Sequence, residues 1–435
     1  MSVPKRDPAT LQTASGMPVI KVMNDTLVFA NDEITRLREL AKRVAEIAAL
    51  PIQAEKAALW QRHNDLQTTE PLIFIDPENG WNECIPATQL QCKAPMARVW
   101  EMFLLKQIYW FEVFKDDKVI EPFFDVPYSF SDTGWGVELN REHGEGQGSF
   151  IIIPAIADYD GDLPKVHFPE IIIDKEESDA VLELAHDVFD GILTVRRKTA
   201  WWWSLGCTRN FIDLRGLENF LCDLILEPEN VHKLMSLLCE GWLKRLDFFE
   251  SNGYLALNTE GTYVGSGGFG YTKDLPQQNY NADKITTMDM WGLVESQETV
   301  AVSPQMYGEF ILPYHIKIAE RFGLNCYGCC EGFNPRWEYI KTIPRLRRVS
   351  VSPWADVNAC DELLGKNYIA SVKPSPTPLA VSVMDEDAVR AELAKIVKAT
   401  GDCVTEIIMK DNHTLGGNPR NAARWVELAR EAIGR

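Results

Sequence analysis

The chain has 435 residues, of which 46% are hydrophobic and 25% are charged. These proportions are typical of a soluble globular enzyme and exclude a disordered or fibrous chain. The 63 acidic side chains outnumber the 44 basic ones, so the formal net charge is -19. Because this charge repels phosphate backbones and anionic lipid, it argues against binding to nucleic acid or to a membrane surface, and it favours a small molecule or a protein as the partner.

The sequence predicts neither a membrane span nor a signal peptide. No apolar run approaches the roughly 18 residues of a membrane span, and the N-terminal stretch MSVPKRDPATLQTASG lacks the hydrophobic core of a signal peptide. We therefore expect a cytoplasmic protein with a disordered tail over residues 1–20 and a single domain over residues 21–435. The ten cysteines are too sparse for a disulfide framework in so long a chain, so reduced thiols are expected.

Helical spacing of apolar residues appears first over residues 33–50, in EITRLRELAKRVAEIAAL. Several of the segments with this spacing begin with Ser, Asp or Asn near Pro and stop at Gly, which are helix start and stop signals. The further helical segments are residues 226–253, 303–323, 385–401 and 418–434.

Short apolar runs between the helices are typical of buried strands. The runs are residues 72–76, 122–126, 191–195, 254–258, 323–328, 347–352, 367–373 and 404–410. From residue 254 onward strand and helix alternate, which predicts a parallel sheet. Eight candidate strands favour a (β/α)8 barrel, and an open doubly wound sheet is the alternative that periodicity leaves open. Residues 133–190 look like an insertion with short strands of its own.

Polar residues gather where the predicted strands end, which is where barrel enzymes carry their chemistry. Those residues are Asp125, Asn258, Glu260, Cys329, Cys330, Glu331, Ser352, Asp356, Lys373, Asp411 and His413. Cys329 and Glu331 share one strand face, and His413 follows the last strand, so the three could converge on one zinc ion with an open position. Packed thiols, a redox CxxC pair of Cys326 and Cys329, which lacks a thioredoxin-like context, and a capping or loop histidine are the alternatives that need no metal.

Two further stretches suggest ligand contacts. GSGGFG, at residues 265–270, is not followed by an apolar helix, so it does not indicate a dinucleotide cradle and is predicted to be a flexible lid. AWWWS, at residues 200–204, offers an aromatic surface for a planar ligand, although at least one of its tryptophans is expected in the core.

The segment over residues 304–375 resembles the uroporphyrinogen decarboxylase superfamily, in which a helix carrying Pro-Tyr precedes a strand ending in His-x-Cys-Gly. SPQMYGEFILPYHIKIAERFG, the cysteine-bearing strand and RLRRVSVSPWADV carry the resemblance, which extends from about residue 70 to the C-terminus. The Arg-Gln-Ala-Gly-Arg motif of the decarboxylases is absent, because the region after LIFID reads PENGWNECIPATQL. Within the superfamily the chain therefore looks more similar to the corrinoid-dependent O-demethylase methyltransferases. The resemblance implies a (β/α)8 barrel with an N-terminal helical extension.

The resemblance also implies an activity and a zinc site. The His-x-Cys motif falls on Tyr327 and Cys329, and the Gly-Cys-Gly of zinc methyltransferases falls near His413. Zinc would be held by Cys329, Glu331 and His413. Glu295 is a further ligand or acid, with a helix N-terminal charge as the alternative. The reaction would move a methyl group from a methoxylated aromatic to the Co(I) of a corrinoid protein.

The expected chemistry assigns roles to the remaining candidates. A phenolate whose conjugate acid has a pKa of about 10 leaves poorly unless its oxygen is protonated or bound to a Lewis acid. Without zinc, the proton would come from Tyr327, Glu295 or Asp125. The substrate-binding candidates are Trp135 and Trp202 for the aromatic ring and Asn258 for a neighbouring hydroxyl. The expected partners are the corrinoid protein and, in a homodimer, a second copy of the chain.

Two other functions stay open at the level of sequence. A uroporphyrinogen decarboxylase-like lyase would need several cations for its substrate's carboxylates, and Arg196, Arg197, Lys198 and Arg209 lie around the third predicted strand. A non-catalytic protein that binds an aromatic or corrinoid ligand is the second alternative.

Overall fold

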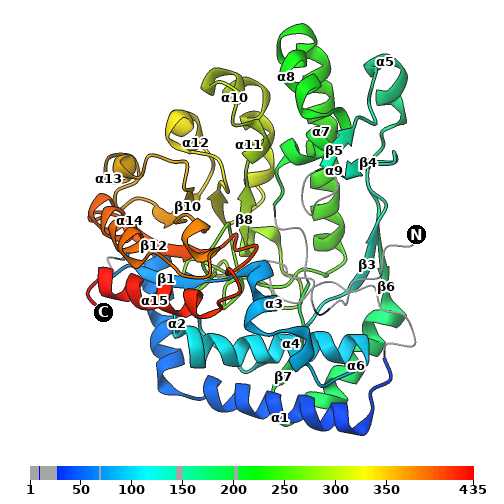
Figure 1. Ribbon diagram of the computed structural model, residues 1–435. Helices are drawn as coiled ribbons and strands as arrows, with labels where there is room; N and C mark the ends of the chain where they lie inside the picture. Colours follow the sequence, from blue (N-terminus) through cyan, green and yellow to red (C-terminus); the bar gives the residue numbers. More distant parts are fainter. Residues whose placement is uncertain (1–8, 10–26, 68–69, 144–149, 200–203) are drawn as a thin grey trace.

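The computed structural model describes residue 9 and residues 27–67, 70–143, 150–199 and 204–435 (Figure 1). The tail expected over residues 1–20 lies outside the described residues apart from Ala9, and so does Trp202. No described helix has the length and apolar character needed to cross a membrane.

A six-stranded sheet forms the centre of the molecule, and every neighbouring pair of its strands is parallel. Its order is β8 (Trp291–Val294), β9 (Leu324–Tyr327), β10 (Leu346–Val351), β11 (Ile369–Val372), β12 (Val404–Met409) and β1 (Leu72–Ile75). The predicted parallel sheet is therefore confirmed. The first strand of the chain, β1, pairs with the last, β12.

A second parallel pair, β2 (Phe123–Val126) and β7 (Thr194–Arg197), stands apart from the large sheet. Among the described residues no strand ladder joins the two sheets, so the structure establishes an α/β fold with a parallel sheet. Closure into an eight-stranded barrel stays a prediction.

One predicted strand is wrong, because residues 254–258 form no strand. The side-chain amide of Asn258 pairs with β8 instead: it donates to the Trp291 carbonyl oxygen and accepts the Trp291 N–H, both at 2.9 Å. A side chain thus supplies the bonds that a strand backbone would have made. The strand that sequence analysis missed is β8 itself, a run of only four residues.

Fifteen α-helices of the described chain surround the sheets. They are α1 (Asn31–Ala48), α2 (Pro51–Asn64), α3 (Trp81–Cys84), α4 (Pro95–Tyr109), α5 (Tyr159–Asp162), α6 (Lys175–Phe189), α7 (Cys207–Arg215), α8 (Leu217–Leu226), α9 (Pro228–Ser251), α10 (Pro304–Phe310), α11 (Leu312–Ala319), α12 (Trp337–Ile340), α13 (Cys360–Leu363), α14 (Glu386–Ala399) and α15 (Arg420–Ala432). Helices α1, α4 and α6 run along the lower side of the view in Figure 1. Helix α1 buries its leucines at helical spacing, as the sequence predicts, and it ends just before Pro51 begins α2.

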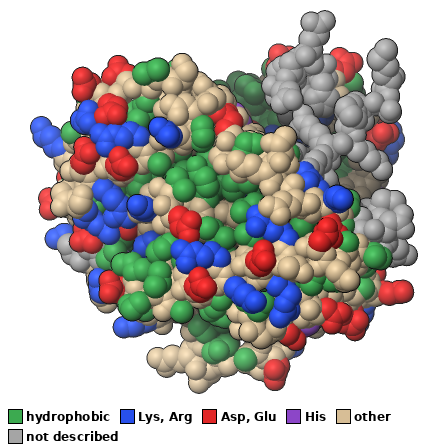
Figure 2. Space-filling view, turned by 60° about the horizontal axis from the view of Figure 1, so that its bottom comes forward, with side chains coloured by type: hydrophobic (Ala, Val, Ile, Leu, Met, Phe, Trp, Pro, Cys, Tyr) green, Lys and Arg blue, Asp and Glu red, His purple; other side chains and the backbone are tan. Residues whose placement is uncertain are grey.

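Residues 129–174 contain two antiparallel ladders. Strand β3 (Ser129–Asp132) pairs with β6 (Ile171–Asp174), and β4 (Asn140–His143) pairs with β5 (Phe150–Ile153). On the face shown in Figure 2, acidic and basic side chains are interspersed, so the net charge of -19 is not concentrated in one acidic patch there.

The glycine-rich stretch over residues 265–270 is buried, so the predicted flexible lid is wrong. Gly268 has a φ of +85°, and a Cβ atom there would lie 2.8 Å from both carboxylate oxygens of Glu406. At Gly267 a Cβ would lie 3.1 Å from the Ile408 side chain. The glycines therefore let the backbone pack directly on β12, where a side chain has no room.

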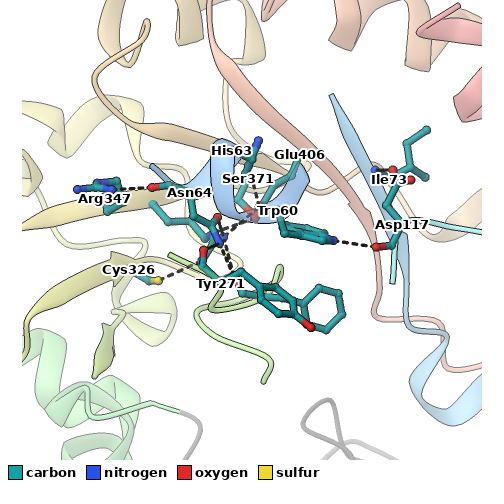
Figure 3. Close-up of polar contacts among 12 residues, drawn as sticks. Trp60, His63, Asn64, Ile73, Asp117, Tyr271, Cys326, Arg347, Ser371 and Glu406 are labelled. Carbon is teal, nitrogen blue, oxygen red and sulfur yellow. Dashed lines mark hydrogen bonds and ion pairs between the residues drawn. The ribbon is translucent and has the colours of Figure 1, made fainter. Parts of the chain in front are cut away.

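A buried polar network joins helix α2 to this packed segment (Figure 3). The His63 Nε2 atom lies 3.2 Å from Glu406 Oε2, and the Asn64 amide donates to the carbonyl oxygens of Phe269 and Tyr271 at 2.7 and 2.8 Å. Arg348 pairs with Glu406 at 3.0 Å. These contacts fix the N-terminal helices against the sheet, because each buried polar group needs a partner.

The Asp117 side chain binds the backbone at the edge of β1, so we expect its replacement by alanine to lower the stability of the protein. Its carboxylate is fully buried, accepts the Ile73 N–H at 2.8 Å, and pairs with Arg430 and Arg435 at 3.2 and 3.1 Å. Asp117→Ala leaves the buried Ile73 N–H without an acceptor and removes the partner of two arginines that are 24% and 27% exposed, so we expect the free energy of unfolding to fall by about 1–3 kcal/mol. Urea denaturation measures this change.

The matched control is Asp387→Ala, because the Asp387 side chain is 98% exposed in its pair with Arg390. Its free energy of unfolding should stay within about 0.5 kcal/mol of the wild-type value. Equal losses in the two variants would contradict the role assigned to Asp117.

Candidate functional site

A polar residue follows every strand of the large sheet at its carboxyl end. These residues are Asp76 after β1, Glu295 after β8, Cys329 after β9, Ser352 after β10, Lys373 after β11 and Lys410 after β12. In parallel sheets, ligands bind outside the carboxyl ends of the strands. We call Glu295, Cys329, Glu331, Lys373, Lys410 and Glu78 the carboxyl-end cluster and take it as the candidate active site.

Glu295 is a buried carboxyl group with little to stabilise its charged form. The residue is 1% exposed, and its oxygens accept bonds from Ser204 Oγ at 3.1 Å and from the Gln297 N–H at 2.9 Å. Burial, with the neighbouring carboxyl groups of Glu298 and Glu331, raises the pKa of Glu295 well above its usual range. The raised pKa favours the protonated form of Glu295, and a protonated carboxyl group can act as an acid.

Glu331 ties the ends of two strands together. Its carboxylate accepts the backbone N–H of Ser296 at 2.8 Å and the backbone N–H of Cys329 at 2.9 Å. Ser296 follows β8 by two residues and Cys329 follows β9 by two, so one buried side chain holds both turns. Both oxygens of Glu331 are thus committed to the backbone.

Two adjacent thiols lie at the end of β9. The Sγ atoms of Cys329 and Cys330 are 3.5 Å apart, and Cys329 is buried whereas Cys330 is exposed. The hydrogen bond from the Cys329 thiol lowers the pKa of Cys330. Ser350 Oγ donates to the Cys329 carbonyl oxygen at 2.9 Å, which fixes the backbone between the two strands.

Two lysines bring nitrogen donors to the same end of the sheet. Lys373 Nζ donates to the carbonyl oxygen and to Oγ of Ser371 at 2.9 and 2.7 Å, and burial lowers the pKa of Lys373 to about 7. Lys410 Nζ lies 3.6 Å from Glu78 Oε1, and burial raises the pKa of Glu78 to about 7. The cluster therefore holds two groups, Lys373 and Glu78, that exchange protons near neutral pH.

Comparisons with known proteins find similar solved structures but no similar sequence. No family model matches the chain, and no curated protein matches it. A solved structure described as a methyltransferase from Methanosarcina mazei is similar over 87% of this chain and 98% of that chain, with a TM-score of 0.49 and 13% sequence identity. A likeness of this degree does not establish a shared activity.

The structure does not bring Cys329, Glu331 and His413 together as metal ligands. His413 is exposed, and its Nδ1 atom lies 3.1 Å from the Asn79 amide nitrogen. In the part of the chain that the structure describes, no three His, Cys, Asp or Glu side chains are arranged to hold a metal ion. Because Glu331 gives both oxygens to backbone N–H groups, this donor set does not fit a zinc ion.

Tyr327 and Asp125 are placed for structural contacts. The Tyr327 ring lies 6.4 Å from that of Tyr307 on α10, its hydroxyl is 3.1 Å from Ser296 Oγ, and burial raises the pKa of Tyr327 well above its usual range. A hydroxyl that releases its proton so reluctantly is a poor acid. Asp125 accepts two bonds from the Arg196 guanidinium, at 2.7 and 3.1 Å, in the separate β2–β7 pair.

The described candidates for substrate binding, Trp135 and Asn258, make structural contacts. Trp135 is buried, with the Arg245 guanidinium of α9 4.9 Å from its ring, and Gly241 leaves the space for it. The Asn258 amide is taken by β8, so it is not free to hold a substrate hydroxyl. Trp202 lies outside the described residues. Sequence reasoning missed Glu78 and Lys410; the one signal for Lys410 is its place at the end of the last strand.

Proposed function

We propose that the protein is a methyltransferase that moves a methyl group from a methoxylated aromatic to a Co(I) corrinoid carried by a partner protein. The observation that supports the proposal best is Glu295, a buried carboxylic acid at the carboxyl end of β8 with a raised pKa. An aryl methyl ether can lose its methyl group only if the departing oxygen is stabilised, and a protonated carboxyl group supplies that stabilisation.

The methyl transfer would need a nucleophile from the co-substrate and an acid from this chain. The corrinoid, as co-substrate, supplies the nucleophile for the methyl carbon. Glu295 donates its proton to the ether oxygen as the bond from carbon to oxygen breaks, so the phenol leaves neutral and Glu295 is left as a carboxylate. Proton uptake from solvent restores the acid. No step is assigned to zinc, because the available donors do not fit it.

Other members of the cluster would position Glu295 and stabilise the negative charge that develops on the departing oxygen. Glu331 keeps the turns after β8 and β9 in register through its two backbone bonds, which holds Glu295 in place. Lys373 follows β11 at the same carboxyl end of the sheet, where its amine would offer an N–H donor to the departing oxygen.

The decarboxylase alternative is less well supported, because its candidate cations are already compensated. Arg196 pairs with Asp125 and Glu260 at 2.7 Å each, and Lys198 lies 3.5 Å from Asp125. A substrate with many carboxylates would have to displace these acidic partners. The ion pairs therefore disfavour a polyanionic tetrapyrrole as substrate.

The test is a screen of methoxylated phenols with a reduced corrinoid protein. We expect free phenol and methylated corrinoid in equal amounts, and neither product when the corrinoid is left out, because the chain holds no group suited to attacking an unactivated methyl carbon. Release of CO₂ from uroporphyrinogen without corrinoid would favour the lyase instead. Binding of a methoxyarene with no turnover under any condition would favour a binding protein.

A further inference from the structure

The adjacent thiols Cys329 and Cys330 have no role in the proposed methyl transfer. Their sulfur atoms are 3.5 Å apart, and no disulfide joins them. Among the described cysteines only Cys330 and Cys222 are exposed, so a solution reagent reaches Cys330 directly and meets Cys329 just behind it. This is the arrangement of an attacked thiol and a resolving thiol.

The backbone around Cys329 is anchored on both sides. Its N–H donates to Glu331 Oε2 at 2.9 Å, and its carbonyl oxygen accepts the Ser350 hydroxyl at 2.9 Å. Gly328 before it has a φ of +90°, a conformation that favours glycine and turns the chain out of β9. The turn therefore holds the two sulfur atoms close while it leaves Cys330 at the surface.

We propose that Cys329 and Cys330 form a redox-active dithiol that a low-molecular-weight disulfide closes into a bond between the two neighbouring residues. The Cys330 sulfur attacks the small disulfide and forms a mixed disulfide, which releases one small thiol. The Cys329 sulfur then attacks the Cys330 sulfur and releases the second small thiol. Two protein thiols are oxidised and one small disulfide is reduced, so atoms and electrons balance.

The closed bond acts on the carboxyl-end cluster through the backbone. Adjacent Cα atoms lie about 3.8 Å apart, below the range of about 4.4–6.8 Å found for most disulfides, so the peptide between the cysteines has to rearrange. That peptide begins at the Cys329 carbonyl group, which accepts the bond from Ser350, and the N–H bonded to Glu331 belongs to the same residue. Oxidation therefore loosens the Glu331 tie between the turns after β8 and β9, and reduction restores it.

The experiment treats the full-length protein with oxidised glutathione, alkylates the remaining thiols and digests with trypsin. The fragment over residues 322–336 carries Cys326, Cys329 and Cys330. In the oxidised protein we expect only one of the three cysteines of this fragment to be alkylated. Before reduction, the fragment should be two hydrogen atoms lighter than a fragment with the same single alkyl group and two free thiols. Dithiothreitol should restore all three. Because the readout is a mass, it does not depend on the proposed methyl transfer.

Single-site variants decide which thiols take part. Cys222→Ser removes the other exposed thiol and should leave closure unchanged, and Cys326→Ser should also leave it unchanged. Cys330→Ser should abolish closure. A lasting glutathione adduct on Cys330 with Cys329 still open to alkylation would overturn the proposal, as would a bond that includes Cys326 or no change in the fragment at all.

Discussion

Replacing Glu295 by Gln is expected to lower the rate of methyl transfer by roughly 10²- to 10⁴-fold, the usual contribution of a general acid. Glutamine has the same size, and its carbonyl oxygen can still accept the bond from Gln297, but it cannot give up a proton. The loss should therefore appear in kcat with little change in KM. Steady-state measurement of phenol release checks both values.

The leaving group and the pH supply independent readouts of the same role. Methoxyarenes whose phenols are more acidic need less help, so the rate difference between wild type and Glu295→Gln should shrink along such a series. In the wild type the active form is the protonated one, so activity should fall as pH rises through the raised pKa of Glu295. That falling limb should be absent in the variant.

Glu338→Gln is the control, because the Glu338 side chain is 77% exposed on α12 and lies outside the carboxyl-end cluster. It should keep the wild-type rate and pH profile. A Glu295→Gln enzyme with the wild-type rate, or with the wild-type falling limb, would remove Glu295 from the chemistry.

Replacing Arg348 by Met is expected to cost about 3–5 kcal/mol of folding free energy, because it leaves the buried Glu406 carboxylate without its cation. Arg348 is 1% exposed and Glu406 is 0% exposed. Although burial opposes it, the ion pair with Arg348 lowers the pKa of Glu406 to about 2. Urea denaturation of both proteins measures the difference.

The pH dependence of this loss follows from the lowered pKa. The pKa of Glu406 is lower in the folded state, so its stabilising contribution is present above its ordinary pKa of 4.5 and is lost as pH falls toward about 2. The deficit of Arg348→Met should therefore be largest at neutral pH and should shrink in acid.

Lys341→Met provides the comparison, because Lys341 and Glu338 form a pair with side chains 42% and 77% exposed. It should change stability by less than about 1 kcal/mol. If Arg348→Met and Lys341→Met were equally stable at neutral pH, the network that joins α2 to the sheet would not have the role described here.

The fold could be predicted where burial shows directly in the sequence. Strands β9 to β12 and β1 are apolar runs separated by helical segments, and the pattern predicts both their positions and their parallel pairing. The absence of a strand at residues 254–258 and the presence of β8 could not be predicted. Both depend on the side-chain amide of Asn258, which bonds to the backbone of Trp291. The burial of residues 265–270 likewise depends on space left by β12.

The candidate site was predictable in place but not in detail. Cys329, Glu331 and Lys373 could be identified because they follow apolar runs, whereas Glu295 was named only through the family resemblance, because β8 was missed. The commitment of Glu331 to two backbone N–H groups and the contact between His413 and Asn79 are tertiary contacts, and no residue spacing encodes them. Those contacts show that Glu331 holds the backbone and does not act as a metal ligand.

A single turnover with an isotopically labelled methoxy group tests the central claim most directly. The protein, a methoxylated phenol with the label in its methyl group, and a stoichiometric amount of reduced corrinoid protein are mixed, and the position of the label is followed by NMR. Methyl transfer predicts that the label leaves the arene and appears on the corrinoid at the rate at which free phenol forms. Label that stays on the arene, or that appears as formaldehyde or methanol without corrinoid, would contradict it.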